Sequence, residues 1–161
     1  MQTILSSLLA VALVIAAAPS TAFDPGHLAQ LKNTKKCPRC DLTNADLRNA
    51  ILNGAHLDGA DLTNADLRKA HLAGAQLNKA NLTSAVLSDA NLNGANLIQA
   101  NLRGARLFRA NLSGANLSKA NLIDARLRFA KLLGAILDGV KLCRTMMANI
   151  KIRYRNDHCP K

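Results

Sequence analysis

The chain has 161 residues, of which only 2% are aromatic and none is Trp, so a globular core built around large aromatic side chains is disfavoured. Burial must instead come from a repeated arrangement of smaller apolar residues. The formal net charge of +11 also disfavours functions that need a strongly acidic surface.

The N-terminal residues have the character of a secretion signal. They carry no charged side chain over residues 1–22, run apolar from Leu8 to Ala18, and end in a small-x-small sequence suited to signal-peptidase cleavage. We interpret residues 1–22 as a signal peptide, although cleavage after Ala18 fits nearly as well and the first residues lack Lys or Arg. A retained membrane anchor is the alternative, but the apolar run is short for a membrane span.

A short helix is predicted after this signal. Asp24-Pro25 is typical of an N-cap followed by Pro at the first helical position, and Leu28 with Leu31 forms a short apolar stripe. The sequence therefore predicts a helix from about Pro25 to Asn33, which would cover the first turn of the repeated segment that follows.

From residue 41 to residue 142 the sequence repeats every five residues. Leu occupies every fifth position from Leu42 through Leu142 without a gap, and Ala stands two places earlier except at Cys40 and Val140. An α-helix cannot use this spacing, because five residues turn about 500° and leave no continuous stripe. In an extended backbone the Ala and Leu of one repeat share a face, so each pentapeptide forms one short side of a coil with both side chains inside.

The number of sides follows from a second interval. Gly lies two residues after a Leu at Gly54 and then every 20 residues to Gly134, and Thr recurs at the same interval from Thr43 to Thr83. Gly is favoured where φ is positive or another backbone comes close, so we interpret this Gly as one special corner of a four-sided coil. With coils stacked about 4.8 Å apart, about five coils would make a rod on the order of 24 Å long.

The repeat of Ala, then Asp or Asn, then Leu and two variable residues resembles the pentapeptide-repeat family. The resemblance covers residues 41–142 and implies an all-β fold, a right-handed quadrilateral β-helix, whose handedness the spacing alone does not provide. The predicted organisation is a signal peptide at 1–22, an N-terminal cap at 23–40, the solenoid at 41–142 and a C-terminal cap at 143–161.

The C-terminal cap is predicted from an alternating pattern. Ile150, Ile152 and Tyr154 alternate with basic residues, as in a half-buried strand. A solenoid exposes its apolar interior at both ends, so this segment is expected to close the second end.

The four cysteines lie in two pairs near opposite ends of the rod. Disulfides need Cα atoms within about 7 Å, which leaves Cys37–Cys40 and Cys143–Cys159 and excludes a single four-cysteine zinc site. The Cys37-x-x-Cys40 spacing also occurs in thiol oxidoreductases. Here Cys40 takes an inward Ala position without a βαβ context, so a structural clip is favoured over redox chemistry. Disulfides also agree with export, because they persist in oxidising compartments.

No enzyme activity, metal site or cofactor is predicted. The chain has no Glu, no Gly-rich phosphate loop, and no Ser, His and Asp arrangement that spacing would bring together. The four histidines, His27, His56, His71 and His158, do not align on one side of the coil.

Charge and aromatic residues gather at one end of the rod. The formal charge is −2 over residues 41–90, +6 over residues 91–142 and +4 over residues 143–161. Arg and aromatic residues are enriched at binding hot spots, and the register places six of them on one side as a candidate interaction surface. The alternatives are a solvated surface or one covered by the C-terminal tail. The six residues are Arg106, Phe108, Arg109, Arg126, Arg128 and Phe129.

These features predict a non-catalytic, exported scaffold or protein-interaction module. Its expected partner is an unidentified protein or an anionic envelope component, and a homodimer is left open. The expected location is the periplasm or the extracellular space, or the thylakoid lumen if the source is a cyanobacterium, with no stable membrane span after signal cleavage.

A DNA-mimic modulator of a type II topoisomerase is the alternative function. That activity is known among proteins with a similar repeat, where a negatively charged rod imitates duplex DNA, and here the basic charge and the export signal disfavour it. Direct nucleic-acid binding is not expected either, because single aromatic residues on two coils make a poor stacking platform.

Overall fold

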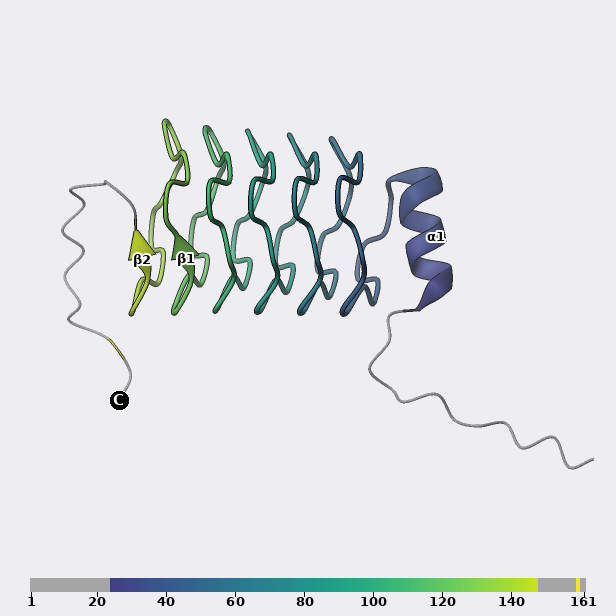
Figure 1. Ribbon diagram of the computed structural model, residues 1–161, viewed down its shortest axis with the longest axis horizontal. Coiled ribbons are helices and arrows are strands. Elements are labelled where there is room, and N and C mark those ends of the chain that lie inside the picture. The colour runs from purple at the N-terminus through teal and green to yellow at the C-terminus, as the bar shows by residue number, and fades with distance from the viewer. Residues whose placement is uncertain (1–23, 148–158, 160–161) are drawn as a thin grey trace, which may run out of the picture.

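The computed structural model describes residues 24–147 and residue 159 (Figure 1). Helix α1 (Pro25–Thr34) stands at one end of an elongated stack of coils, and strands β1 (Arg126–Leu127) and β2 (Met146–Met147) pair at the other end. The predicted signal peptide and the alternating segment at 150–155 lie outside the described residues. In the part that the structure describes, no helix is long and apolar enough to cross a membrane.

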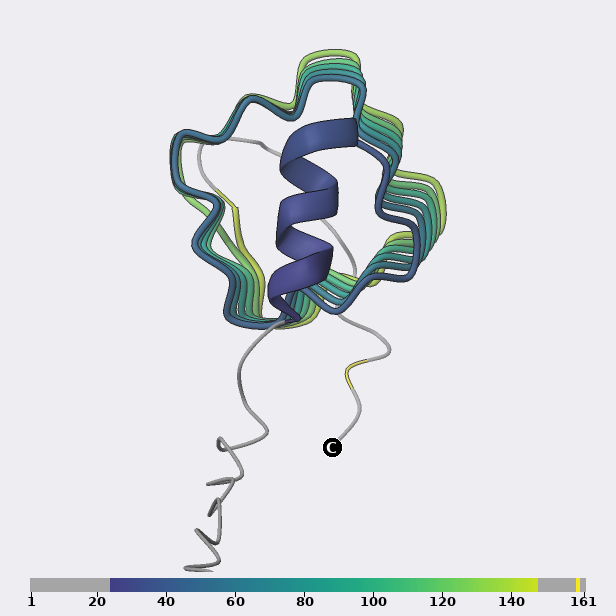
Figure 2. The same cartoon turned by 90° about the vertical axis from the view of Figure 1, so that its right-hand side faces the viewer.

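The coil has four sides. Each side contributes five residues, and a residue on one side pairs with the residue 20 positions later, which lies one full turn further along. Isolated parallel bridges recur every five residues from Lys36↔His56 to Asn121↔Lys141, and β1 and β2 continue the series. Each side is so short, with a turn after it, that most of the pairing consists of single bridges. Figure 2, viewed along the rod, shows the coils superimposed on one outline.

The inward leucines and alanines form one continuous core. Every ladder leucine from Leu42 to Leu127 is at most 2% exposed. Burial of a Leu side chain contributes roughly 1.5–3 kcal/mol, which offsets the poor strand propensity of the Asn, Asp and Ala residues around it. In the last described coil, Leu132, Leu137 and Leu142 are only half-buried.

A positive φ occurs at every corner of the coil and is not a property of the glycine corners alone. Lys79, Arg109 and Phe129 have φ values of 57°, 57° and 62°, close to the 63° of Gly94. The interpretation of the recurring Gly as a single special corner was therefore wrong, although the four-sided register it suggested is present. A Cβ added to Gly94 would meet nothing within 4 Å, so the advantage of Gly there is conformational.

The Asp or Asn before many of the leucines stabilises the turn that follows. Asn101 Oδ1 accepts a hydrogen bond from Arg103 N at 3.3 Å, and Asn121 Oδ1 accepts one from Ile123 N at 3.1 Å. The same amides also link the coils, because Asn121 Nδ2 donates to Asn101 Oδ1 at 3.1 Å and Asn101 Nδ2 donates to Asn81 Oδ1 at 3.3 Å. These two uses explain why the repeat prefers Asp and Asn at this position.

Helix α1 lies across the end of the first coil (Figure 2). It begins after Asp24, whose carboxylate accepts a hydrogen bond from Gly26 N at 2.7 Å, and it ends at Lys35 in a left-handed conformation. Leu31 is fully buried, and Leu28 packs against the core. The helix is one residue longer than the predicted span.

Candidate interaction surface

The structure places the six candidate residues on one side of the solenoid. We call it the Leu107 side, because Leu107 is one of its inward leucines. Arg106 and Arg126 are partners in a parallel bridge, so the two coils carry their outward residues in register. The inward leucines of this side are Leu47, Leu67, Leu87, Leu107 and Leu127.

The two phenylalanines contact each other on the outside of this side. The ring centroids of Phe108 and Phe129 are 5.5 Å apart in an edge-to-face arrangement, and the two residues are 39% and 48% exposed. Arg128 Cζ lies 4.8 Å from the centroid of the Phe129 ring. Edge-to-face and cation–π contacts are both favourable, so they hold the rings and one guanidinium group in a defined cluster at the surface.

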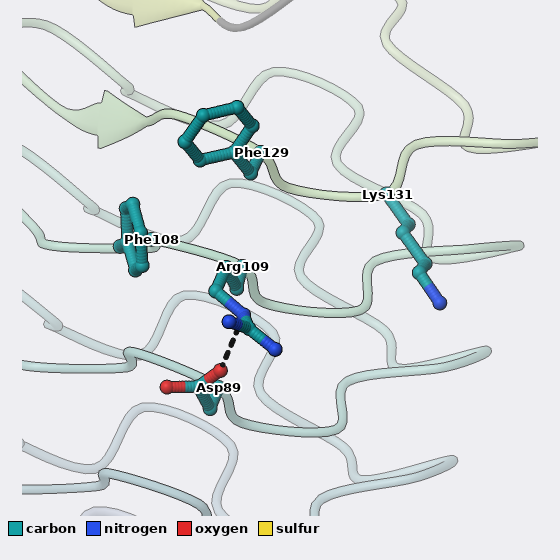
Figure 3. A pocket seen from close by; sticks show the side chains of 5 residues that line it. All are labelled: Asp89, Phe108, Arg109, Phe129 and Lys131. Carbon is teal, nitrogen blue, oxygen red and sulfur yellow. Dashed lines mark ion pairs between the residues drawn. The ribbon is translucent and has the colours of Figure 1, made fainter.

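Arg109 differs from the other arginines because it has an acidic partner. Its Nε lies 3.0 Å from Asp89 Oδ1, which belongs to the preceding coil (Figure 3). The local charge of Arg109 is therefore compensated. Sequence reasoning did not include Asp89 in the surface, although its place 20 residues before Arg109 was a usable signal.

An open hollow lies beside the phenylalanines. It has a volume of about 460 Å³ and is lined by Asp89, Phe108, Arg109, Phe129 and Lys131. In Figure 3 the two rings lie on one flank, and Lys131 reaches in from the other flank. Lys131 was not among the predicted surface residues, because it follows the next corner of the coil.

The remaining three arginines keep an uncompensated charge. In the part of the chain that the structure describes, no carboxylate forms an ion pair with Arg106, Arg126 or Arg128. Like charges at directly opposite positions of paired strands are destabilising. Repulsion between the side chains of Arg106 and Arg126 is therefore expected to lower the stability of the fold locally, and a bound anion would reduce this repulsion.

The N-terminal end of the same side shows the opposite arrangement. Arg48 Nη2 lies 2.6 Å from Asp46 Oδ2, and Arg68 pairs with Asp66. The hydrogen bond from the Arg48 side chain lowers the pKa of Asp46 to about 2. Among the described residues of this side, the arginines of the first coils are therefore paired with aspartates, whereas three of the four arginines of the last coils are unpaired.

The backbone of the Leu107 side is already hydrogen-bonded between coils. Arg106 N donates to Ala85 O and Arg126 N donates to Ala105 O, both at 2.9 Å. The backbone groups to which an added strand would bond are therefore already used at these positions. A partner must be recognised by the outward side chains.

Met146 extends this surface beyond the predicted residues. It pairs in register with Arg126 through strands β1 and β2 and is 62% exposed. The five-residue repeat ends at Leu142, so the sequence pattern gave no reason to continue the side as far as Met146.

Both predicted disulfides are present in the structure. The Cα atoms are 5.3 Å apart for Cys37–Cys40 and 5.4 Å apart for Cys143–Cys159. Within the described residues, no group of three His, Cys, Asp or Glu side chains could hold a metal ion.

Comparison with known proteins gives the following similarities. The family model for pentapeptide repeats matches residues 40–75, 65–104 and 105–142. The crystal structure of a pentapeptide repeat protein, Rfr23, from the cyanobacterium Cyanothece 51142 has a TM-score of 0.70 and 31% identity, covering 76% of this chain and 97% of that chain. A pentapeptide repeat protein from the thylakoid lumen of Arabidopsis thaliana has a TM-score of 0.58 and 31% identity, covering 68% and 72%. A comparison with curated proteins found no match.

Proposed function

Because this chain belongs to the pentapeptide-repeat family, whose members form right-handed quadrilateral β-helices, we propose that it is a non-catalytic, exported interaction module. The inward leucines and alanines and the asparagine hydrogen bonds between coils maintain the fold. Binding is therefore assigned to the outward side chains on one side of the coil. The Leu107 side is assigned this role, and its partner is anionic.

One observation carries this proposal. Arg106, Arg126 and Arg128 have no carboxylate partner in the described residues, and they stand beside two exposed phenylalanines. Arg106 and Arg126 also occupy the place where the repeat prefers Asp or Asn, so they give up the turn and ladder hydrogen bonds made there. These two positions therefore add positive charge to the surface and contribute no side-chain hydrogen bond to the turn or to the ladder.

Export is the second part of the proposal. It is supported by the apolar, uncharged residues 1–22 and by the two disulfides, because disulfides are rare in the cytosol. The similar protein from the Arabidopsis thaliana thylakoid lumen agrees with an oxidising or luminal compartment. We assign the protein to the periplasm or the extracellular space, or to the thylakoid lumen in a cyanobacterial source.

DNA mimicry toward a type II topoisomerase is the weaker candidate. A mimic needs a negatively charged rod, whereas residues 91–142 carry a formal charge of +6. No observation on this chain favours that activity.

The test is affinity capture from the exported fraction with three proteins. These are the wild type, Arg106→Glu with Arg128→Glu, and a control, Lys79→Glu with Lys119→Glu, which makes the same charge change on the opposite side of the coil. We expect a component that the wild type and the control capture and that the Arg106→Glu, Arg128→Glu protein does not. An identical set of captured components and an identical oligomeric state for all three proteins would contradict the proposal.

A further inference from the structure

We propose that the C-terminal end of the Leu107 side docks the rod onto an anionic phospholipid surface. The docking surface consists of Arg106, Arg126, Arg128, Phe108, Phe129 and Met146. This inference rests on the proposed function, because it names the chemical class of the anionic partner.

The exposed apolar side chains gather at the basic end of the rod. All but one of the large exposed hydrophobic residues in the described part lie between residues 108 and 146. Three of them, Phe108, Phe129 and Met146, stand on the Leu107 side. Exposed aromatic and aliphatic side chains beside basic residues are the composition that binds the interface of an anionic bilayer. The six exposed residues are Ile51, Phe108, Phe129, Leu133, Ile136 and Met146.

A positive charge and an apolar surface lie in direct contact in this cluster. The guanidinium of Arg128 lies 4.8 Å from the centroid of the Phe129 ring, and Phe129 contacts Phe108. A lipid surface offers phosphate groups and acyl carbons within one thin layer, so it can satisfy both kinds of group together. A segment made of acidic residues alone would pair with the arginines and leave the rings without an apolar partner.

The shape of the side also fits a planar partner. Successive coils repeat in register at residues 106, 126 and 146, and the backbone amides of Arg106 and Arg126 are bonded within the coil stack. Strand addition is therefore disfavoured, and the hollow beside the rings is open. A bilayer surface requires no matching register, because its headgroups rearrange around the fixed arginines.

The first experiment compares two vesicle compositions. The full chain is expressed, the form that the cell produces is purified with its disulfides intact, and co-sedimentation is measured with vesicles of phosphatidylcholine alone or mixed with phosphatidylglycerol. We expect binding to the mixed vesicles, little binding to neutral vesicles, and weaker binding as salt is raised.

A charge-matched pair of variants tests which side binds. Arg106→Gln with Arg126→Gln is expected to weaken partitioning about 25-fold, since each basic residue near an anionic surface contributes about fivefold. Lys79→Gln with Lys119→Gln removes the same charge from the opposite side. Gln99 naturally occupies the equivalent corner between those two lysines, so the control should fold normally and lose far less binding.

A second pair tests the apolar contribution. Phe108→Ser with Phe129→Asn is expected to weaken binding about tenfold or more. The replacements copy Ser88 and Asn49, which hold the same positions on earlier coils, so folding should be retained and is checked by thermal unfolding. Ile51→Asn removes an exposed apolar residue from the other end of the rod and should leave binding unchanged.

Three results would overturn the lipid assignment. The first is equal binding to neutral and anionic vesicles, the second is equal weakening by the Lys79, Lys119 control, and the third is a failure to bind anionic vesicles. If vesicles do not bind while Arg106- and Arg128-dependent capture of a protein persists, the lipid inference fails and the proposed function stands. If that capture is absent as well, both fail.

Discussion

Arg106 and Arg126 extend from adjacent coils as partners in one parallel bridge, so two positive side chains repeat in register on the same side. At the equivalent place on another side, Asn101 and Asn121 form a hydrogen-bonded ladder. The same backbone position therefore serves stability on one side and carries unpaired charge on the other.

The first prediction is that Arg106→Asn with Arg126→Asn raises the free energy of unfolding by about 1 kcal/mol. The new amides can accept hydrogen bonds from the turn and bond to each other, and the like-charge contact disappears. Urea unfolding with the disulfides intact measures the change. If the variant is more stable and no longer binds its partner, the arginines reduce stability in favour of binding, as functional residues often do. A lower free energy of unfolding would contradict the proposed cost of the like-charge contact.

The second prediction concerns the asparagine ladder. Asn101→Ala is expected to lower the free energy of unfolding by roughly 1–3 kcal/mol, because Asn101 bonds to the amides above and below it and to Arg103 N. Ser113→Ala is the control, and it should change the free energy by less than about 0.5 kcal/mol. Equal effects in urea unfolding would show that the ladder adds little to stability.

The leucine spacing was sufficient to assign the sides of the coil. Because the period of five places Ala and Leu inside, and 20 residues complete one turn, Arg106 and Phe129 could be assigned to one side without coordinates. Helix α1 was also predictable, because Asp24 and Pro25 form a local start signal that does not depend on distant contacts.

Two features were not read correctly from the same pattern. The glycine interval suggested one special corner, but the backbone takes a positive φ after every Leu and accepts Lys79 or Phe129 there, because packing of the core imposes the turn. The second feature is which arginines have a partner. The register places Asp89 directly before Arg109 on the same side, and this signal was not used, whereas the contact of Arg128 with the Phe129 ring required side-chain geometry.

The third prediction separates conformation from space at a glycine corner. Gly94→Asn should be nearly neutral, because Asn44 and Asn64 adopt a positive φ at equivalent corners. Gly94→Val should cost about 1–2 kcal/mol, since a β-branched residue is strained in the left-handed region although open space surrounds Gly94. Thermal unfolding measures both variants. Equal losses would indicate that the cost comes from packing and not from backbone conformation.

The fourth prediction is a pH dependence at the N-terminal end of the Leu107 side. The Arg48 side chain lowers the pKa of Asp46 from 3.8 to about 2, so this pair stabilises the fold above pH 3.8 and loses its contribution as the pH falls toward 2. Asp46→Asn keeps an oxygen that can accept from Arg48 N and removes the charge. The Tm difference between wild type and variant should therefore shrink over that range, and a constant difference would contradict the assignment to the ion pair.

The last prediction concerns the two disulfides, which close loops of different length. Cys143 and Cys159 are 16 residues apart in sequence, whereas Cys37 and Cys40 are 3 apart. Loop-closure entropy then predicts a loss of about 3 kcal/mol for Cys143→Ala with Cys159→Ala, and a smaller loss for Cys37→Ala with Cys40→Ala. The second pair is also the milder change because Cys40 occupies an Ala position of the repeat.

Two measurements check this prediction. Peptide mapping of the purified exported protein without reduction should recover only Cys37–Cys40 and Cys143–Cys159 as linked peptides. Urea unfolding should then rank the two double variants in the order given. A peptide joining Cys37 to Cys159 would contradict the placement of the pairs at opposite ends, because a disulfide holds its two Cα atoms within about 7 Å.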